Sequence, residues 1–312
     1  LAAAFAAPLA SSLIVIESIE RFDAPKTAIT TLLAGVVAGV IATLVFPVNP
    51  YHLIEVSEPA LAFWVQMKYF LILAVIISIV GKLYAAIMIS FKRVYSAVKS
   101  PTSVKMFYLV LVAYIISLMQ VNLTGGGEQF LLEQAQNGST EMMWVLAVML
   151  LHFGFSVCSV LPGGNFIPTL VTGGLLGRCV GLIAVKYGII GQESVTYVML
   201  ISMSAFLVAI ERTPLTAIVL ITEITGHFEV FYPSVVVGGL TYYFTELLQM
   251  KSFNVILYED MVSSSDFQEE KRYALSVEVM TGSYFDGKAV GELSLPEHCV
   301  IIGVHRDGKN LV

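Results

Sequence analysis

Charged residues are scarce in this chain. Asp, Glu, Lys and Arg make up 13% of its 312 residues, whereas 57% are apolar, and soluble domains usually carry about 25% charged residues. The formal net charge of −6 and the lack of any basic run exclude nucleic acid as a partner. With a mean hydropathy of +0.82, the sequence predicts an integral membrane protein of the all-α polytopic class.

Cysteine and histidine are also rare. Cys158, Cys179 and Cys299 lack the spacing of a metal or redox motif, and the five histidines are scattered along the chain. No nucleophile, base and orienting residue form a recognisable catalytic set. We therefore expect no metal site, no cofactor and no enzymatic activity.

Long apolar runs are abundant, but several are too short to cross a bilayer. They lie at about 2–17, 28–47, 61–90, 106–121, 142–161, 165–186, 193–210, 214–224 and 230–248. A spanning helix needs about 20 residues, and short, Gly/Pro-interrupted helices are typical of transporters and channels built from broken helices. A plain helical bundle is the alternative interpretation. The basic cluster Lys92, Arg93, Lys99 and Lys105 predicts that the loop after the third run is cytoplasmic.

The segment 162–169, Pro-Gly-Gly-Asn-Phe-Ile-Pro-Thr, interrupts two of these runs. Non-helical backbone at membrane depth is tolerated only where protein buries it or where it lines a wet cavity. The apolar run that follows can form a helix, and the free N–H groups of a helix start attract anions. The segment is therefore a candidate anion site.

Three motifs together resemble the CLC chloride channel and transporter family over residues 1–262. They are Gly163-Gly164-Asn165-Phe166-Ile167-Pro168 with Gly173-Gly174-Leu175-Leu176-Gly177-Arg178, the stretch 205–226 containing Glu211-Arg212-Thr213-Pro214-Leu215-Thr216, and Ala3-Ala4-Phe5-Ala6-Ala7-Pro8-Leu9-Ala10 running on to Glu17. The resemblance implies a fold of two inverted halves with tilted and broken helices, a homodimer, and an anion pathway in each subunit. Because Leu1 is not a methionine and lies inside an apolar stretch, we expect a fragment whose gating-glutamate loop lies upstream.

The same resemblance implies the site residues. Backbone N–H groups of Gly164, Asn165, Phe166 and Ile167 would bind the anion, with a tyrosine hydroxyl at the start of the last membrane helix, which we assign to Tyr258. A phenol donor adds to backbone donors without a positive charge that would trap the anion. Tyr258 as an interfacial tyrosine and Phe166 as a packing residue are the alternatives.

Two carboxylates, Glu17 and Glu223, lie in apolar helices, where a charge is costly and suggests a function. For Glu223 we favour a structural, hydrogen-bonded role over proton transfer. Glu17 matches the first of a pair of acidic residues in the family, and Ser18 stands where proton-coupled relatives have their internal proton glutamate. Glu17 is therefore the candidate proton-pathway residue, and a different proton route or a lack of coupling are the alternatives.

After residue 262 the composition changes. Residues 263–273 form a polar linker, and 274–312 predict strands at 274–280 and 299–304, a short helix at 287–293, and a hairpin with Asp307-Gly308 at its tip. This small α/β tail resembles the C-terminal regulatory (TrkA/RCK) domain of potassium-transport proteins. It implies a cytoplasmic tail with a small regulatory ligand.

These observations predict a multi-pass protein of a prokaryotic plasma membrane that moves chloride or fluoride, most simply in exchange for protons. Asn165, Ile167 and Ser18 resemble a fluoride-exporting branch of the family, whereas chloride-handling members commonly have an apolar residue at the asparagine position. A passive chloride channel is the alternative within this class. A potassium-transport subunit would need a cation filter of carbonyls or acidic rings, which the sequence lacks, and a non-functional truncated product is a further alternative.

Overall fold

The computed structural model describes residues 2–5, 7–20, 25–45, 56–59, 61–98, 100–118, 127–137, 166–264, 279, 287–289, 293, 303–306 and 309–310. The chain divides into two compact units, Leu1–Glu259 and Asp260–Val312. The division falls close to the predicted linker.

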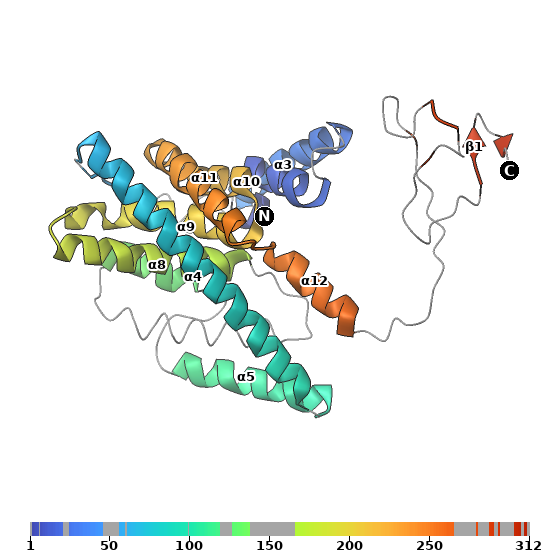
Figure 1. Cartoon of the computed structure of the whole chain (residues 1–312), viewed down its shortest axis with the longest axis horizontal. Coiled ribbons are helices and arrows are strands. Elements are labelled where there is room, and N and C mark those ends of the chain that lie inside the picture. The colour runs from blue at the N-terminus through green and yellow to red at the C-terminus, as the bar shows by residue number, and fades with distance from the viewer. Residues whose placement is uncertain are drawn as a thin grey trace. The chain divides into compact units, whose positions relative to one another are not determined.

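The described part of the first unit is helical (Figure 1). In chain order its elements are α1 (Ala2–Phe5), α2 (Pro8–Ile14), the π-helix η1 (Val15–Glu20), α3 (Pro25–Val45), α4 (Phe63–Ala97), α5 (Thr102–Leu118), α6 (Glu128–Asn137), α8 (Phe166–Lys186), η3 (Gln192–Ser194), α9 (Val195–Glu211), α10 (Pro214–Thr225), η4 (Phe228–Val230), α11 (Phe231–Leu247) and α12 (Phe253–Ser264).

Four of these helical segments are long and apolar enough to cross a membrane. They are Ala28–Val45, Phe63–Tyr95, Phe166–Lys186 and Gln192–Glu211. α10 has 12 residues, and at 1.5 Å per residue it is about 18 Å long, too short for a hydrocarbon core of about 30 Å. The prediction of an all-α membrane protein with short, broken helices is confirmed.

The core of the unit is organised around α9, whose residues are all buried. α8 packs along one side of α9, and α4, α10 and α11 pack against its other faces. Figure 1 shows α4 crossing the α8–α9 pair. A helix that is apolar on all sides is stable only inside such a layer of other helices.

Glycines on one face of α8 let it approach α9 closely. A Cβ atom placed at Gly173 would lie 2.6 Å from the Phe206 Cβ, and one at Gly177 would lie 2.4 Å from the Ser202 Cβ. Small residues are the usual means of close helix packing in membranes, where contact area has to replace the hydrophobic effect. Gly173 and Gly177 form what we call the α8–α9 seam, which fixes the position of α8 relative to α9.

The ends of α9 and α10 follow the usual end chemistry of helices. α9 ends where Arg212 adopts the left-handed conformation, with φ 62° and ψ 32°. α10 begins with Pro214 at its first position and ends at Gly226, with φ 72°. Proline suits a helix start and glycine a left-handed helix end. Only Arg212 and Thr213 connect α9 to α10, so the chain reverses sharply inside the unit.

In the second unit, β1 (His305–Arg306) and β2 (Lys309–Asn310) form an antiparallel pair in which Arg306 lies opposite Lys309. The antiparallel pairing predicted for this hairpin is therefore confirmed, whereas its tip, Asp307-Gly308, lies outside the described residues. Of the strands predicted at 274–280 and 299–304, only Val279, Gly303 and Val304 are described, and they are not in strands. The helix predicted at 287–293 is wrong for its described residues, because 287–289 and 293 are not helical and Gly287 has a positive φ of 73°.

Candidate functional site

The predicted anion site lies at the start of α8. Phe166 is the first residue of this helix, and Phe166 and Ile167 are half-buried. The ring of Phe166 contacts that of Phe5 in α1, with centroids 6.4 Å apart. Gly164 and Asn165 lie outside the described residues. The structure thus places Phe166 and Ile167 at a helix start, where first-turn N–H groups have no intrahelical acceptor.

A buried carboxylate, Glu211, ends α9. It is 7% exposed, and the side-chain amide of Asn254 in α12 donates to Glu211 Oε2 at 2.6 Å. Tyr84 of α4 lies within electrostatic range of this carboxylate and beside the side chain of Thr169, which belongs to the first turn of α8. We call Tyr84, Thr169, Glu211 and Asn254 the Glu211 cluster.

The Glu211 cluster has members on four helices, α4, α8, α9 and α12, and its α8 member, Thr169, lies at the start of α8, where the anion site is predicted. Tyr84 and Thr169 are fully or almost fully buried. A buried carboxylate is costly unless it serves a purpose. Within the described chain, the cluster is therefore the best candidate for a group that binds and releases a proton close to the predicted anion site.

Sequence reasoning missed Glu211. The residue stands at the end of a fully apolar run and immediately before Arg212, which looks like the charged end of a membrane helix. The available signal was the two-residue connection to Pro214, because such a short turn between two apolar helices stays inside the protein. A carboxylate at this point is then buried.

Glu17 and Glu223 form a reciprocal pair of helix caps. The two oxygens of Glu223 accept the backbone N–H groups of Leu9 at 3.0 Å and Ala10 at 2.9 Å, at the start of α2. The oxygens of Glu17 accept the N–H groups of Leu215 at 2.9 Å and Thr216 at 2.8 Å, and the Thr216 hydroxyl at 2.6 Å, at the start of α10. The start of α2 is capped by a carboxylate of α10, and the start of α10 by a carboxylate of η1, which directly follows α2.

The sequences around the two caps are similar. Residues 7–17 read Ala-Pro-Leu-Ala-Ser-Ser-Leu-Ile-Val-Ile-Glu and residues 213–223 read Thr-Pro-Leu-Thr-Ala-Ile-Val-Leu-Ile-Thr-Glu. In both, proline starts the helix and glutamate follows nine positions later. The carboxylate satisfies otherwise free N–H groups and complements the positive end of the helix dipole. The structural, hydrogen-bonded role predicted for Glu223 is confirmed.

Replacing Glu223 by glutamine should destabilise the protein. Glutamine keeps one acceptor oxygen but sets its NH₂ group against a backbone N–H, so one donor loses its partner. Loss of a charged acceptor costs about 1–3 kcal/mol. Thermal unfolding in detergent should show a lower midpoint for Glu223→Gln than for Glu229→Gln, because Glu229 is exposed. Equal midpoints for the two variants would contradict the capping role.

Tyr258 lies in the second turn of α12 and is 68% exposed. The start of α12 is occupied by Phe253, which is 1% exposed and belongs to the core. The expectation that a tyrosine begins this helix is therefore wrong in position, because α12 starts five residues before Tyr258. Its role as an anion donor stays a prediction.

Comparisons with known proteins give consistent results. A family model described as "Voltage gated chloride channel" matches residues 1–246. The H(+)/Cl(-) exchange transporter ClcA of Cronobacter sakazakii (strain ATCC BAA-894) is 26% identical over 249 residues, covering 76% of this chain and 52% of that protein. ClcA of Yersinia pestis bv. Antiqua (strain Angola) is 30% identical over 254 residues, covering 76% and 51%. The chain thus spans about half the length of the curated relatives it matches.

Two solved structures share the fold. A slow cyanobacterial Cl-/H+ antiporter aligns with a TM-score of 0.71 at 22% identity, covering 84% of this chain and 63% of that one. A CLC-type fluoride/proton antiporter aligns with a TM-score of 0.59 at 18% identity, covering 77% and 59%. At these identities the similarity shows the fold.

Proposed function

Because the chain belongs to the voltage-gated chloride channel family, we propose that it moves halide ions across a membrane in exchange for protons. Its curated relatives are named H(+)/Cl(-) exchange transporters, and two solved structures with this fold are of antiporters of chloride or fluoride. An exchanger needs an anion site and a group that carries a proton inside the membrane. The described chain offers a candidate for each.

The Glu211 cluster carries the proposal. Ser18 leaves the internal proton relay of the family without its usual acid. Glu211 is a buried carboxylate that accepts a hydrogen bond from Asn254, and it lies within electrostatic range of Tyr84, which is beside Thr169 in the first turn of α8. A carboxyl group in this position takes up and releases a proton beside the anion that it is exchanged for. We assign the proton step to Glu211.

Glu17 receives a different assignment. Its two oxygens accept three hydrogen bonds from the start of α10. A proton carrier has to alternate between two protonation states, which would break this cap in every cycle. We propose that Glu17 caps α10 and does not carry protons.

The anion site is assigned to the start of α8. Backbone N–H groups of Gly164, Asn165, Phe166 and Ile167 would stabilise a dehydrated halide without the full charge that would hold it too tightly. Tyr258 is the remaining candidate donor. Because its side chain is 68% exposed, this role requires an element beyond the described residues to cover α12.

We propose fluoride as the preferred halide, on the strength of Asn165. Fluoride is small and strongly hydrated, so a fluoride site needs more donors than a chloride site, and an amide side chain adds two. Asn165→Val should lower the ratio of fluoride to chloride flux at least about tenfold, since a hydrogen bond to an anion contributes about 1.5–3 kcal/mol. Ion-selective electrodes on loaded liposomes measure this ratio. Equal ratios before and after the substitution would remove the argument for fluoride.

Halide and proton fluxes recorded together test the exchanger. The full-length protein in liposomes loaded with fluoride or chloride should release halide while protons enter, and an imposed proton gradient should drive halide uphill. Halide release without any proton movement would instead establish a passive channel. No movement of either ion would contradict both transport functions.

Further assignments rest on the resemblance and on the bacterial relatives. We propose a homodimer with one anion pathway in each subunit, in a bacterial plasma membrane. We also propose that residues 274–312 form a cytoplasmic regulatory domain of the TrkA/RCK type that binds a small ligand. Crosslinking in the membrane and protease access to the tail in oriented vesicles test these assignments.

A further inference from the structure

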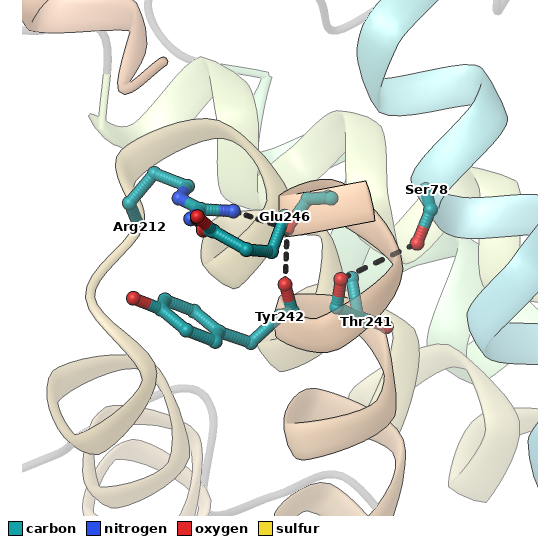
Figure 2. A network of polar contacts seen from close by, with 6 residues as sticks. Ser78, Arg212, Thr241, Tyr242 and Glu246 are labelled. Atoms are coloured by element: carbon teal, nitrogen blue, oxygen red, sulfur yellow. Dashed lines mark hydrogen bonds and ion pairs between the residues drawn. The ribbon is translucent and has the colours of Figure 1, made fainter. Parts of the chain in front are cut away.

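Four side chains join the α9–α10 turn to the last turns of α11. Arg212 Nη1 donates to Thr245 Oγ1 at 2.6 Å, and Arg212 Nη2 pairs with Glu246. The guanidinium carbon of Arg212 lies 4.4 Å from the centre of the Tyr242 ring. Figure 2 shows Arg212 above this ring and beside Glu246. We call Arg212, Tyr242, Thr245 and Glu246 the Arg212 clasp.

The contacts of the Arg212 clasp fix the orientation of the Arg212 side chain more than they stabilise the fold. The Glu246 side chain is 67% exposed, and exposed ion pairs contribute little to the free energy of folding. The Arg212 side chain is 14% exposed, stacks on an aromatic ring and donates to the buried Thr245. A planar guanidinium with these partners has essentially one orientation.

α11 itself is anchored where the clasp binds it. From α4, Lys82 Nζ donates to the carbonyl oxygen of Leu248 at 3.2 Å, and Ser78 Oγ lies 3.5 Å from that of Thr241. Figure 2 shows Ser78 approaching this turn of α11. The clasp therefore ties the α9–α10 turn to an element that α4 already holds.

Backbone strain is found at both turns next to the clasp. Within the part of the chain that the structure describes, the non-glycine residues with positive φ are Arg212, at 62°, and Gln249, at 50°. Arg212 lies in the α9–α10 turn and Gln249 between α11 and α12. A side chain in the left-handed region costs about 1–2 kcal/mol and persists only where the surroundings hold it.

Glu211 immediately precedes Arg212 in the chain. Its carboxylate accepts a hydrogen bond from Asn254 on α12, whereas the Arg212 side chain donates to Thr245 on α11. We propose that the Arg212 clasp is a positioning unit, which holds the α9–α10 turn so that the Glu211 carboxylate stays against Asn254. That this position matters for proton exchange rests on the function proposed above.

Arg212→Gly tests the clasp. Glycine adopts positive φ without strain, so this variant removes the side chain and leaves the backbone conformation of the α9–α10 turn unchanged. Arg212→Lys keeps the positive charge but loses the forked guanidinium group and its stacking on the Tyr242 ring. Lys251→Gln is the control, because it breaks an exposed ion pair with Glu259 outside the clasp. If Arg212→Gly does not fold, Tyr242→Leu removes the ring under the guanidinium instead.

Two readouts decide the outcome. The first is the carboxyl infrared band of Glu211, identified by its loss in Glu211→Gln, which should move toward that of a water-exposed carboxyl group in Arg212→Gly. The second is the number of protons exchanged per halide, which should fall at least about tenfold in Arg212→Gly, because small misplacements of a reacting group are costly. In Arg212→Lys, the position of the Glu211 band and the number of protons per halide should lie between those of Arg212→Gly and those of the parent protein. In Lys251→Gln, both should equal those of the parent protein.

The inference and the proposed function can fail separately. An unchanged Glu211 band in Arg212→Gly overturns the positioning role, whatever the fluxes do. If the parent protein releases halide without protons, the exchange function fails, yet the infrared band still decides whether the clasp holds Glu211. A shifted band with an unchanged proton-to-halide ratio overturns the link between the clasp and transport.

Discussion

Glu211→Gln should abolish proton exchange and leave a passive halide pathway. Glutamine has nearly the shape of glutamate and keeps an oxygen that accepts from Asn254, so the helices should stay in place. It cannot bind or release a proton near neutral pH. A positioned acid or base typically contributes about 10²–10⁴-fold to proton transfer, so we expect the proton flux per halide to fall at least about 100-fold.

Simultaneous halide and pH recordings from liposomes measure this effect. Glu229→Gln is the matched control, because it removes an exposed carboxylate of the same unit. Its proton-to-halide ratio should equal that of the parent protein. If Glu211→Gln also kept the parent ratio, the proton route would have to avoid Glu211, and Glu17 would again be the first candidate.

Gly177→Ala should prevent α8 and α9 from packing. The added Cβ would lie 2.4 Å from both Cβ and Oγ of Ser202 and 2.9 Å from the carbonyl oxygen of Val198. These atoms are backbone or close to it, so no flexible side chain can move aside. Overpacking typically costs about 1–3 kcal/mol, and contacts this short with α9 place the site at or above the upper end. We expect a large loss of folded, monodisperse protein in detergent.

Gly239→Ala provides the contrast. Gly239 lies in α11, and a Cβ placed there has no other atom within 4 Å. Alanine favours helix by about 1 kcal/mol over glycine, so this variant should be neutral or more stable. Size-exclusion profiles and thermal midpoints of the two variants give the comparison. Similar behaviour of both would mean that the α8–α9 seam tolerates a wider spacing.

Proline and glycine made the local fold predictable. Pro214 and Gly226 bound α10, and the run between them was predicted as a helix too short to span the membrane. The start of α8 follows from Gly163-Gly164 and Pro168 in the same way. These residues act through their own backbone preferences, so they can be interpreted without knowledge of the neighbours.

Contacts between distant segments were not predictable in this way. The caps at Glu17 and Glu223 join residues 198 to 214 positions apart, and only the repeated proline-to-glutamate spacing hinted at them. Glu211 was missed because its burial depends on α4, α8 and α12. Tyr258 was placed at a helix start because a family pattern was matched by residue type, whereas Phe253 begins that helix.

The reciprocal caps have the form of a contact between two identical chains. Around a two-fold axis, a residue of one copy binds a second residue of the other, and the same pair recurs with the copies exchanged. Here the start of α2 binds Glu223 while the start of α10 binds Glu17. A protein that arose by joining two copies of one ancestral gene would inherit this arrangement directly. Each segment then supplies the carboxylate that the helix start of the other needs.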